Sequence, residues 1–162
     1  MIFVTLGTQD KSFERLLRDI QKQIDLGNIK EKVVVQAGFT KFDSKDMEIF
    51  DLIPMDDFDK LMNECDLLIT HGGVGSIISG LKKNKKVIAV ARLAKYKEHM
   101  NDHQKQIVDN FSDAGYILKY DDGDDLGKIL KKVKSFKPQK YTSNTDNMIK
   151  LVTDKINELV GE

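Results

Sequence analysis

The sequence is poor in cysteine, proline and long apolar runs, and it contains no tryptophan. Cys65 is the only cysteine, so neither an internal disulfide nor a cysteine-based zinc site can form within the chain. The longest unbroken apolar run is Val87–Ala91, whereas a membrane-spanning helix needs about 20 such residues. No basic segment precedes the apolar N-terminal residues, as a secretory signal requires. We therefore expect a cytoplasmic protein without a membrane anchor of its own.

An excess of charge of either sign is also absent. Lys and Arg together number 26, Asp and Glu number 26, and the formal net charge is zero. A nucleic-acid-binding surface usually leaves a basic excess, so we expect no nucleic-acid partner. Apolar residues at 40% and charged residues at 32% are typical of a globular chain, and the length predicts a single domain over residues 1–162.

Short apolar runs alternate with helical patterns along the chain. The runs predict strands at Ile2–Leu6, Val33–Val35, Ile49–Ile53, Leu67–Thr70, Val87–Ala91 and Tyr116–Leu118. Helical patterns cover about residues 13–24, 56–62, 76–81, 102–112, 124–133 and 143–159. Strands that are apolar throughout and alternate with helices are typical of an α/β fold with a doubly wound, Rossmann-like parallel sheet. Such folds bind ligands beyond the carboxyl ends of their strands.

The strongest local signal, His71-Gly72-Gly73-Val74-Gly75-Ser76, joins the fourth strand to a helix. Glycines allow the backbone to approach an anion, and the free N–H groups of a helix start bind phosphate. No Gly-Lys-Ser/Thr follows, so the segment is not a P-loop, and it lacks the glycine order of a dinucleotide-binding turn. The alternative is a tight turn that needs glycine only for packing.

A second small-residue turn, Gly7-Thr8-Gln9, follows the first strand. Alone it is a weak signal, and a plain turn accounts for it equally well. In a doubly wound sheet, however, it can face the same cleft as the glycine-rich turn. Two such loops would then hold a diphosphate from both sides.

The polar stretch after the fifth strand contains His99 and His103, four residues apart. On one helix face they could bind zinc, but no third ligand is apparent, so we predict no metal site. A polar clamp on a sugar or phosphate is favoured, with a solvated loop as the alternative. The run Lys82–Lys86 indicates a solvated turn or a contact to anionic lipid, and Asp121–Asp125 indicates a turn and helix cap because it lacks an EF-hand glutamate.

Three motifs in this order, Val4–Gln9, His71–Ser76 and Glu98–Gln104, resemble the C-terminal, donor-binding half of a GT-B glycosyltransferase of the family 28 (MurG-like) group. Within that group the chain is similar to small stand-alone subunits. These are the PssE-type proteins of exopolysaccharide and capsule assembly, and the cytosolic donor-binding subunit of the eukaryotic dolichol-linked N-acetylglucosaminyltransferase. The resemblance extends to about Tyr120 and implies a single GT-B C-terminal-type half.

The resemblance implies inverting transfer of a hexose from a UDP-sugar to a lipid-linked acceptor. It implies that uridine diphosphate contacts Gly7, Thr8, Gln9, Met55, His71, Gly72, Gly73, Gly75 and Ser76. It implies that the donor sugar contacts His99, His103 and Gln104. A helix dipole and backbone N–H groups stabilise the leaving diphosphate in this family, so we expect no metal and no other bound cofactor.

Two positions depart from the MurG-like pattern. Ser79 stands where the family has a glutamate that holds the ribose hydroxyls, and Val108 stands where it has a sugar-contacting asparagine. The identity of the donor sugar therefore does not transfer from the family.

The resemblance also implies a separate acceptor-binding half. In split systems a membrane-anchored (PssD-type) subunit supplies it together with the general base, so we assign no catalytic residue to this chain. The chain would then work at the inner face of the membrane through its partner. Two alternatives are a non-catalytic accessory of a partner transferase, which Ser79 favours, and a nucleotide-sugar epimerase, which needs both domains in one chain.

Overall fold

The computed structural model describes residues 1–141, and the helix predicted at residues 143–159 lies outside them. In the described part, one sheet contains parallel strands in the order β3-β2-β1-β4-β5-β6. The strands are β1 (Ile2–Thr5), β2 (Val33–Gln36), β3 (Met47–Phe50), β4 (Leu67–His71), β5 (Lys86–Val90) and β6 (Leu118–Lys119). The predicted doubly wound parallel sheet is confirmed.

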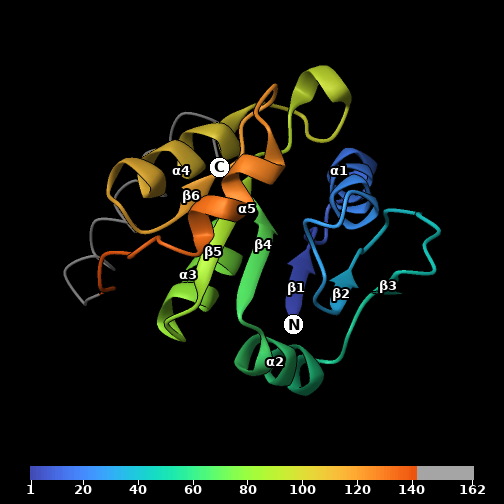
Figure 1. Ribbon diagram of the computed structural model, residues 1–162. Coiled ribbons are helices and arrows are strands. Elements are labelled where there is room, and N and C mark those ends of the chain that lie inside the picture. The colour runs from blue at the N-terminus through green and yellow to red at the C-terminus, as the bar shows by residue number, and fades with distance from the viewer. Residues whose placement is uncertain (142–162) are drawn as a thin grey trace.

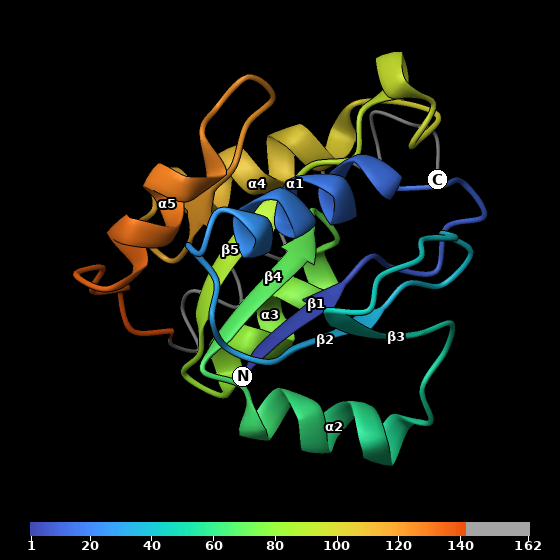
Figure 2. The same ribbon diagram turned by 45° about the vertical axis from the view of Figure 1, so that its right-hand side comes forward.

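Helices cover both faces of the sheet (Figures 1 and 2). They are α1 (Glu14–Asp25), α2 (Met55–Glu64), α3 (Val74–Lys82), α4 (His103–Asp113) and α5 (Leu126–Val133), with a short 3-10 helix η1 (Ala94–Tyr96) before α4. Successive side chains of β1 alternate between the two cores. Ile2 and Val4 pack with α1 and α5, whereas Phe3 packs with α2, α3 and α4. Burial on both faces explains why the strands are apolar throughout.

Four strands differ from the predicted limits by a single residue at one or both ends, and the two edge strands differ by more. The third strand covers Met47–Phe50 instead of Ile49–Ile53, because the backbone N–H of Ile53 donates to the Gln36 side chain at 3.0 Å and Pro54 is the N-cap of α2. The sixth covers Leu118–Lys119 instead of Tyr116–Leu118. The N–H of Tyr116 donates to Phe111 O, so Tyr116 still belongs to the turn that ends α4.

The strand order creates a switch point between β1 and β4. The chain leaves β1 towards β2 and β3 and then crosses back to β4 on the other side of β1. The connections after β1 and β4 therefore lead to opposite faces, to α1 and α3, and leave a crevice between them. Thr5 and Thr70 mark its floor, where their hydroxyls are hydrogen-bonded at 2.8 Å.

The structure also describes three features away from the switch point. Cys65 is buried, and burial raises the pKa of its thiol. Asp125 caps α5 by accepting from the Gly127 N–H at 2.9 Å. In the Lys82–Lys86 run, Lys85 and Lys86 donate to backbone carbonyl groups of the chain, which is typical of a structural turn. No helix within residues 1–141 is long and apolar enough to cross a membrane.

Candidate functional site

A pocket of about 470 Å³ opens at the switch point. It is lined by Thr5, Gly7, Thr8, Gln36, Leu52, Ile53, Met55, Phe58, His71, Gly73, Gly75 and Ser76. The turns after β1 and β4 form two of its walls, and the β3–α2 turn forms a third. Of the residues predicted to contact uridine diphosphate, all except Gln9 and Gly72 line this one pocket.

The start of α3 forms the wall of the pocket that is suited to an anion. Gly73 is the N-cap of α3, and no side chain caps the helix. The first N–H groups of a helix have no partner within it, and they carry the positive end of the helix dipole. Ser76 lies in this first turn, and Thr8 lines the pocket from the β1–α1 turn. Backbone amides and two hydroxyls thus surround a space suited to a phosphate group.

His71 lies between these walls at the end of β4. Its Nδ1 accepts from the Gly73 N–H at 3.1 Å, and its Nε2 lies 3.4 Å from the Ser76 hydroxyl oxygen. Burial, followed by the nearby Arg92 cation, lowers the pKa of His71 to about 4. The ring is therefore neutral at physiological pH.

Two glycines leave the space that the His71 ring fills. A Cβ atom at Gly73 would lie 2.2 Å from His71 Cε1, and one at Gly7 would lie 2.8 Å from both Cε1 and Nε2. Gly7 also has a φ of +81°, which L side chains rarely adopt. Gly75 differs from both, because a Cβ atom there would meet nothing within 4 Å. Gly7 and Gly73 are thus required for packing, while Gly75 faces open space in the pocket.

Gly72 has a packing role as well. Its own Cβ position lies 2.8 Å from Gln104 Cβ and 2.9 Å from Val108 Cγ2. Val108 is itself a buried core residue that packs beside the turn. At Gly72 the turn therefore needs glycine to pack against α4. For this residue, the alternative raised from the sequence, a glycine required for packing, is confirmed.

The residues predicted to contact the sugar do not line the pocket. His99 Nδ1 accepts from the Asn101 N–H at 3.3 Å, and burial, followed by Arg92, lowers the pKa of His99. The His103 N–H donates to the Asn101 side chain, and within the described residues His103 Nδ1 is buried without a hydrogen-bond partner. No group of three or more His, Cys, Asp or Glu residues in the described chain is placed to hold a metal ion.

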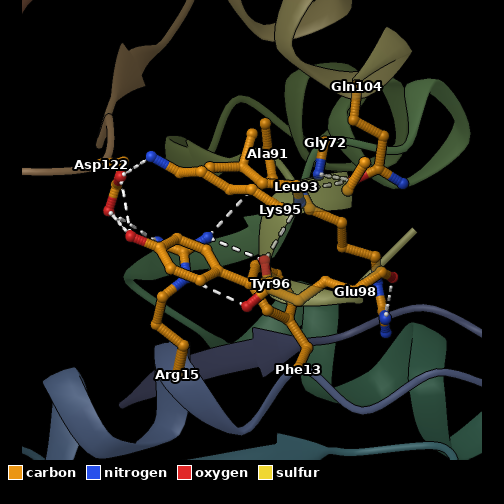
Figure 3. Close-up of polar contacts among 12 residues, drawn as sticks. Phe13, Arg15, Gly72, Ala91, Leu93, Lys95, Tyr96, Glu98, Gln104 and Asp122 are labelled. Atoms are coloured by element: carbon orange, nitrogen blue, oxygen red, sulfur yellow. Dashed lines mark hydrogen bonds and ion pairs between the residues drawn. The ribbon is translucent and has the colours of Figure 1, made fainter. Parts of the chain in front are cut away.

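Gln104 lies in the first turn of α4 and is buried behind the glycine-rich turn. Figure 3 shows its side chain reaching from α4 towards Gly72. Its Oε1 accepts from the N–H groups of Gly72 and Arg92, both at 3.1 Å, and its Nε2 lies 3.3 Å from His71 Nδ1. The carboxamide therefore joins the β4–α3 turn to the residues that follow β5.

Sequence reasoning missed a buried cation, Arg92, which is fully inaccessible to solvent. Its guanidinium donates to the carbonyl oxygens of Leu6, Lys11 and Glu98, and it stacks on the Phe13 ring at 5.0 Å. Burial lowers the pKa of Arg92 to about 10, so it stays charged. Arg92 thereby anchors both ends of the β1–α1 turn to the loop after β5.

A second arginine closes the same loop from outside. Arg15, on α1, makes two hydrogen bonds of 3.0 Å to the buried Glu98 carboxylate. Its guanidinium also stacks on the Tyr96 ring at 4.9 Å, and the Tyr96 hydroxyl donates to Asp122 (Figure 3). The loop after β5 is therefore held against α1 and the β6–α5 turn. A charged residue directly after an apolar strand is the one signal that could have pointed to Arg92.

Comparisons with known proteins agree with this architecture. Residues 1–159 match the glycosyltransferase family 28 C-terminal domain. The UDP-N-acetylglucosamine transferase subunit ALG13 of Candida albicans is 28% identical over 110 residues, which are 68% of this chain and 32% of that protein. The same-named subunit of Candida glabrata is 43% identical over 53 residues, which are 33% of this chain and 25% of that protein. The matches thus span a third or less of these two relatives.

Solved structures are similar in fold. The solution structure of ALG13 superposes with a TM-score of 0.59 at 20% identity and covers 96% of both chains. The crystal structure of Acinetobacter baumannii MurG superposes with a TM-score of 0.51 at 14% identity, covering 82% of this chain and 40% of that one. The family match extends over nearly the whole sequence. The two solved structures share the fold described above. This chain belongs to the glycosyltransferase family 28 C-terminal domain family.

Proposed function

We propose that this chain is the donor-binding subunit of a two-component inverting glycosyltransferase that uses a UDP-sugar. One observation carries the proposal: the β1 and β4 turns and the uncapped start of α3 meet around one pocket. Family membership and the names of the ALG13 relatives support the UDP-sugar part.

The diphosphate binds at the start of α3. Helix amides, the Thr8 and Ser76 hydroxyls and the neutral His71 ring surround it, and no described residue that lines the pocket carries a carboxylate that would repel it. These groups stabilise the negative charge that develops on the leaving diphosphate, so the transfer needs no metal ion. The uracil ring lies on the apolar side of the pocket, against Met55 and Phe58.

The acceptor and the general base come from a partner. The pocket lining offers no carboxylate. Its one histidine has a pKa lowered to about 4 and an Nδ1 that already accepts a hydrogen bond, so the described residues at this site supply no effective base for the acceptor hydroxyl. A membrane-anchored acceptor-binding subunit provides the base and holds the chain at the inner face of the membrane. Residues 1–162 act as one domain in this assembly.

The pathway follows from the acceptor. The relatives' names favour N-acetylglucosamine as the sugar. They do not name an acceptor, so neither a dolichol-linked glycan nor the predicted exopolysaccharide or capsule has support from them. Reconstitution with a membrane-anchored partner separates the two, with a dolichol-diphosphate-linked sugar in one arm and a bacterial polyprenyl-diphosphate-linked sugar in the other. Robust transfer by the chain without a partner would contradict the two-component proposal.

The direct test of donor binding is calorimetry with uridine diphosphate. Guanosine diphosphate and inorganic pyrophosphate are the controls, and each titration is run with a chelator. We expect uridine diphosphate to bind in the presence of the chelator and more tightly than either control. Loss of binding on chelation would contradict the metal-independent site.

A non-catalytic accessory role is the second candidate, and Ser79 favours it. Its hydroxyl donates to Gly75 O within α3 at 2.9 Å, so it does not replace a glutamate that reaches the ribose. This candidate predicts no binding of uridine diphosphate, together with increased activity of the partner transferase when the chain is added.

A further inference from the structure

The orientation of the Gln104 carboxamide is fixed by its surroundings. Two backbone N–H groups, those of Gly72 and Arg92, point at the same side-chain atom from 3.1 Å. A backbone N–H can only donate, so that atom must be the oxygen. The other end of the carboxamide, at 3.3 Å from His71 Nδ1, is therefore the NH₂ group.

The NH₂ group and the Gly73 N–H together fix the proton on His71. An amide nitrogen only donates, so His71 Nδ1 accepts from Gln104 as well as from the Gly73 N–H at 3.1 Å. A ring nitrogen that accepts hydrogen bonds carries no proton. The neutral ring therefore holds its proton on Nε2, the atom that lies 3.4 Å from the Ser76 hydroxyl.

The ring has little freedom to turn away. Added Cβ atoms at Gly7 and Gly73 would lie 2.8 Å and 2.2 Å from its Cε1, so the glycine backbones lie directly beside it. Its Nε2–H is thus directed at the pocket wall formed by the start of α3, where Ser76 lies.

We infer that Gln104 is a positioning residue and not a sugar contact. It fixes His71 as an Nε2–H donor to the anion at α3, and it holds the β4–α3 turn to the end of β5. The inference deepens the proposed function and rests on it for the identity of the anion. The hydrogen-bonding capacity of the Gln104 oxygen is already used by two backbone groups, and its nitrogen faces His71. Three of the four hydrogen-bonding sites of the carboxamide are thus taken up inside the protein, which leaves a single N–H for any other contact.

The surroundings of the ring favour the same neutral state. Burial, followed by the Arg92 cation, lowers the pKa of His71. The ring is neutral when its tautomer is measured at neutral pH.

The test measures the tautomer directly. Nitrogen-15 NMR of the free protein at neutral pH distinguishes a protonated from an unprotonated Nδ1, and no ligand is needed. We expect the proton on Nε2 in the wild type. In Gln104→Glu the carboxylate still accepts from the Gly72 and Arg92 amides, but it offers no N–H and attracts a proton to Nδ1. Because the Gly73 N–H still donates to Nδ1, we expect the fraction of rings with a proton on Nδ1 to rise rather than to reach unity, and the affinity for uridine diphosphate to fall about tenfold.

Gln106→Glu is the matched control, because Gln106 is exposed on the same helix. It makes the same charge change and should leave both the tautomer and the affinity unaltered. Gln104→Met removes the carboxamide without adding charge. The Gly73 N–H still donates to Nδ1, so we expect a smaller rise in the Nδ1 tautomer than in Gln104→Glu and the same direction of affinity change.

Several results would overturn the inference. The first is a wild-type His71 with its proton on Nδ1, which requires no variant to fold. The second is a Gln104→Glu protein that keeps the Nε2 tautomer and full nucleotide affinity but loses transfer, because that pattern belongs to a sugar contact. If the wild type binds no uridine diphosphate, the proposed function fails, and the tautomer still decides the role of Gln104.

Discussion

Gly73 and Gly75 stand two residues apart in one turn, and substitutions at them should have opposite effects on stability. At Gly75 an added Cβ atom meets nothing within 4 Å, and the residue is in the first turn of α3. Glycine within a helix costs about 1 kcal/mol relative to alanine and somewhat less relative to valine. We therefore expect Gly75→Val to leave the free energy of unfolding unchanged or to raise it by up to about 0.5 kcal/mol.

Binding should nevertheless weaken in Gly75→Val. The valine methyl groups would occupy the space in front of the α3 amides, where the diphosphate approaches. Loss of one charge-assisted hydrogen bond costs about 1.5–3 kcal/mol, which corresponds to roughly 10- to 100-fold in affinity. Calorimetry with uridine diphosphate measures this loss, and the melting temperature measures stability on the same samples.

Gly73→Ala is the contrasting variant. Its Cβ atom would lie 2.2 Å from His71 Cε1, so the ring must move and give up the bond from the Gly73 N–H. Overpacking of this kind costs about 2 kcal/mol, or roughly 4–8 °C in melting temperature for a chain of this size. Its effect on binding is therefore mixed with a loss of stability. Wild-type affinity in a folded Gly75→Val protein would refute the anion site, and an unchanged melting temperature in Gly73→Ala would refute the packing argument.

Three further predictions concern single side chains. Arg92→Met leaves three carbonyl oxygens without their donor, so it should lower the free energy of unfolding, measured by chemical denaturation, by about 3 kcal/mol. The control Arg18→Met, at an exposed position, should change it by less than about 0.5 kcal/mol. Ser79→Glu restores the family's ribose-binding side chain and should raise affinity for uridine diphosphate but not for pyrophosphate in competition calorimetry; an equal change for both would contradict a ribose contact. Because burial and Arg92 depress the pKa of His71 from 6.5 to about 4, the unfolded chain takes up this proton first. Stability should fall by up to about 3 kcal/mol as pH drops from 6.5 to 4, and His71→Asn should lack this component in denaturation curves measured across that range.

The sheet could be predicted from the sequence because each central strand is buried on both faces. A continuous apolar run such as Val33–Val35, set between helical patterns, is typical of a strand inside a parallel sheet. The edge strands were predicted less well. Their limits depend on partners distant in sequence. The N–H of Ile53, for example, donates to the Gln36 side chain and not to a neighbouring strand.

The pocket at the switch point could also be predicted, because glycines at strand ends limit where a ligand can approach. The sequence does not separate the roles of these glycines. Gly72 and Gly73 differ from Gly75 only in what surrounds them, namely Gln104 and His71 for the first two and open space for the third. A pattern of residue types contains no information about such neighbours until the strand order is known.

Arg92 shows why the rest of the site was beyond sequence reasoning. An arginine after a strand is usually solvated. The backbone N–H of Arg92, however, donates to the Gln104 carboxamide, which also holds the β4 turn. Its guanidinium donates to carbonyl oxygens of the β1 turn, up to 86 residues away in the sequence. The β1 and β4 walls of the pocket are therefore both fixed to one residue. Loss of the guanidinium should loosen the β1 wall alone, because the backbone N–H that holds the β4 wall does not depend on the side chain.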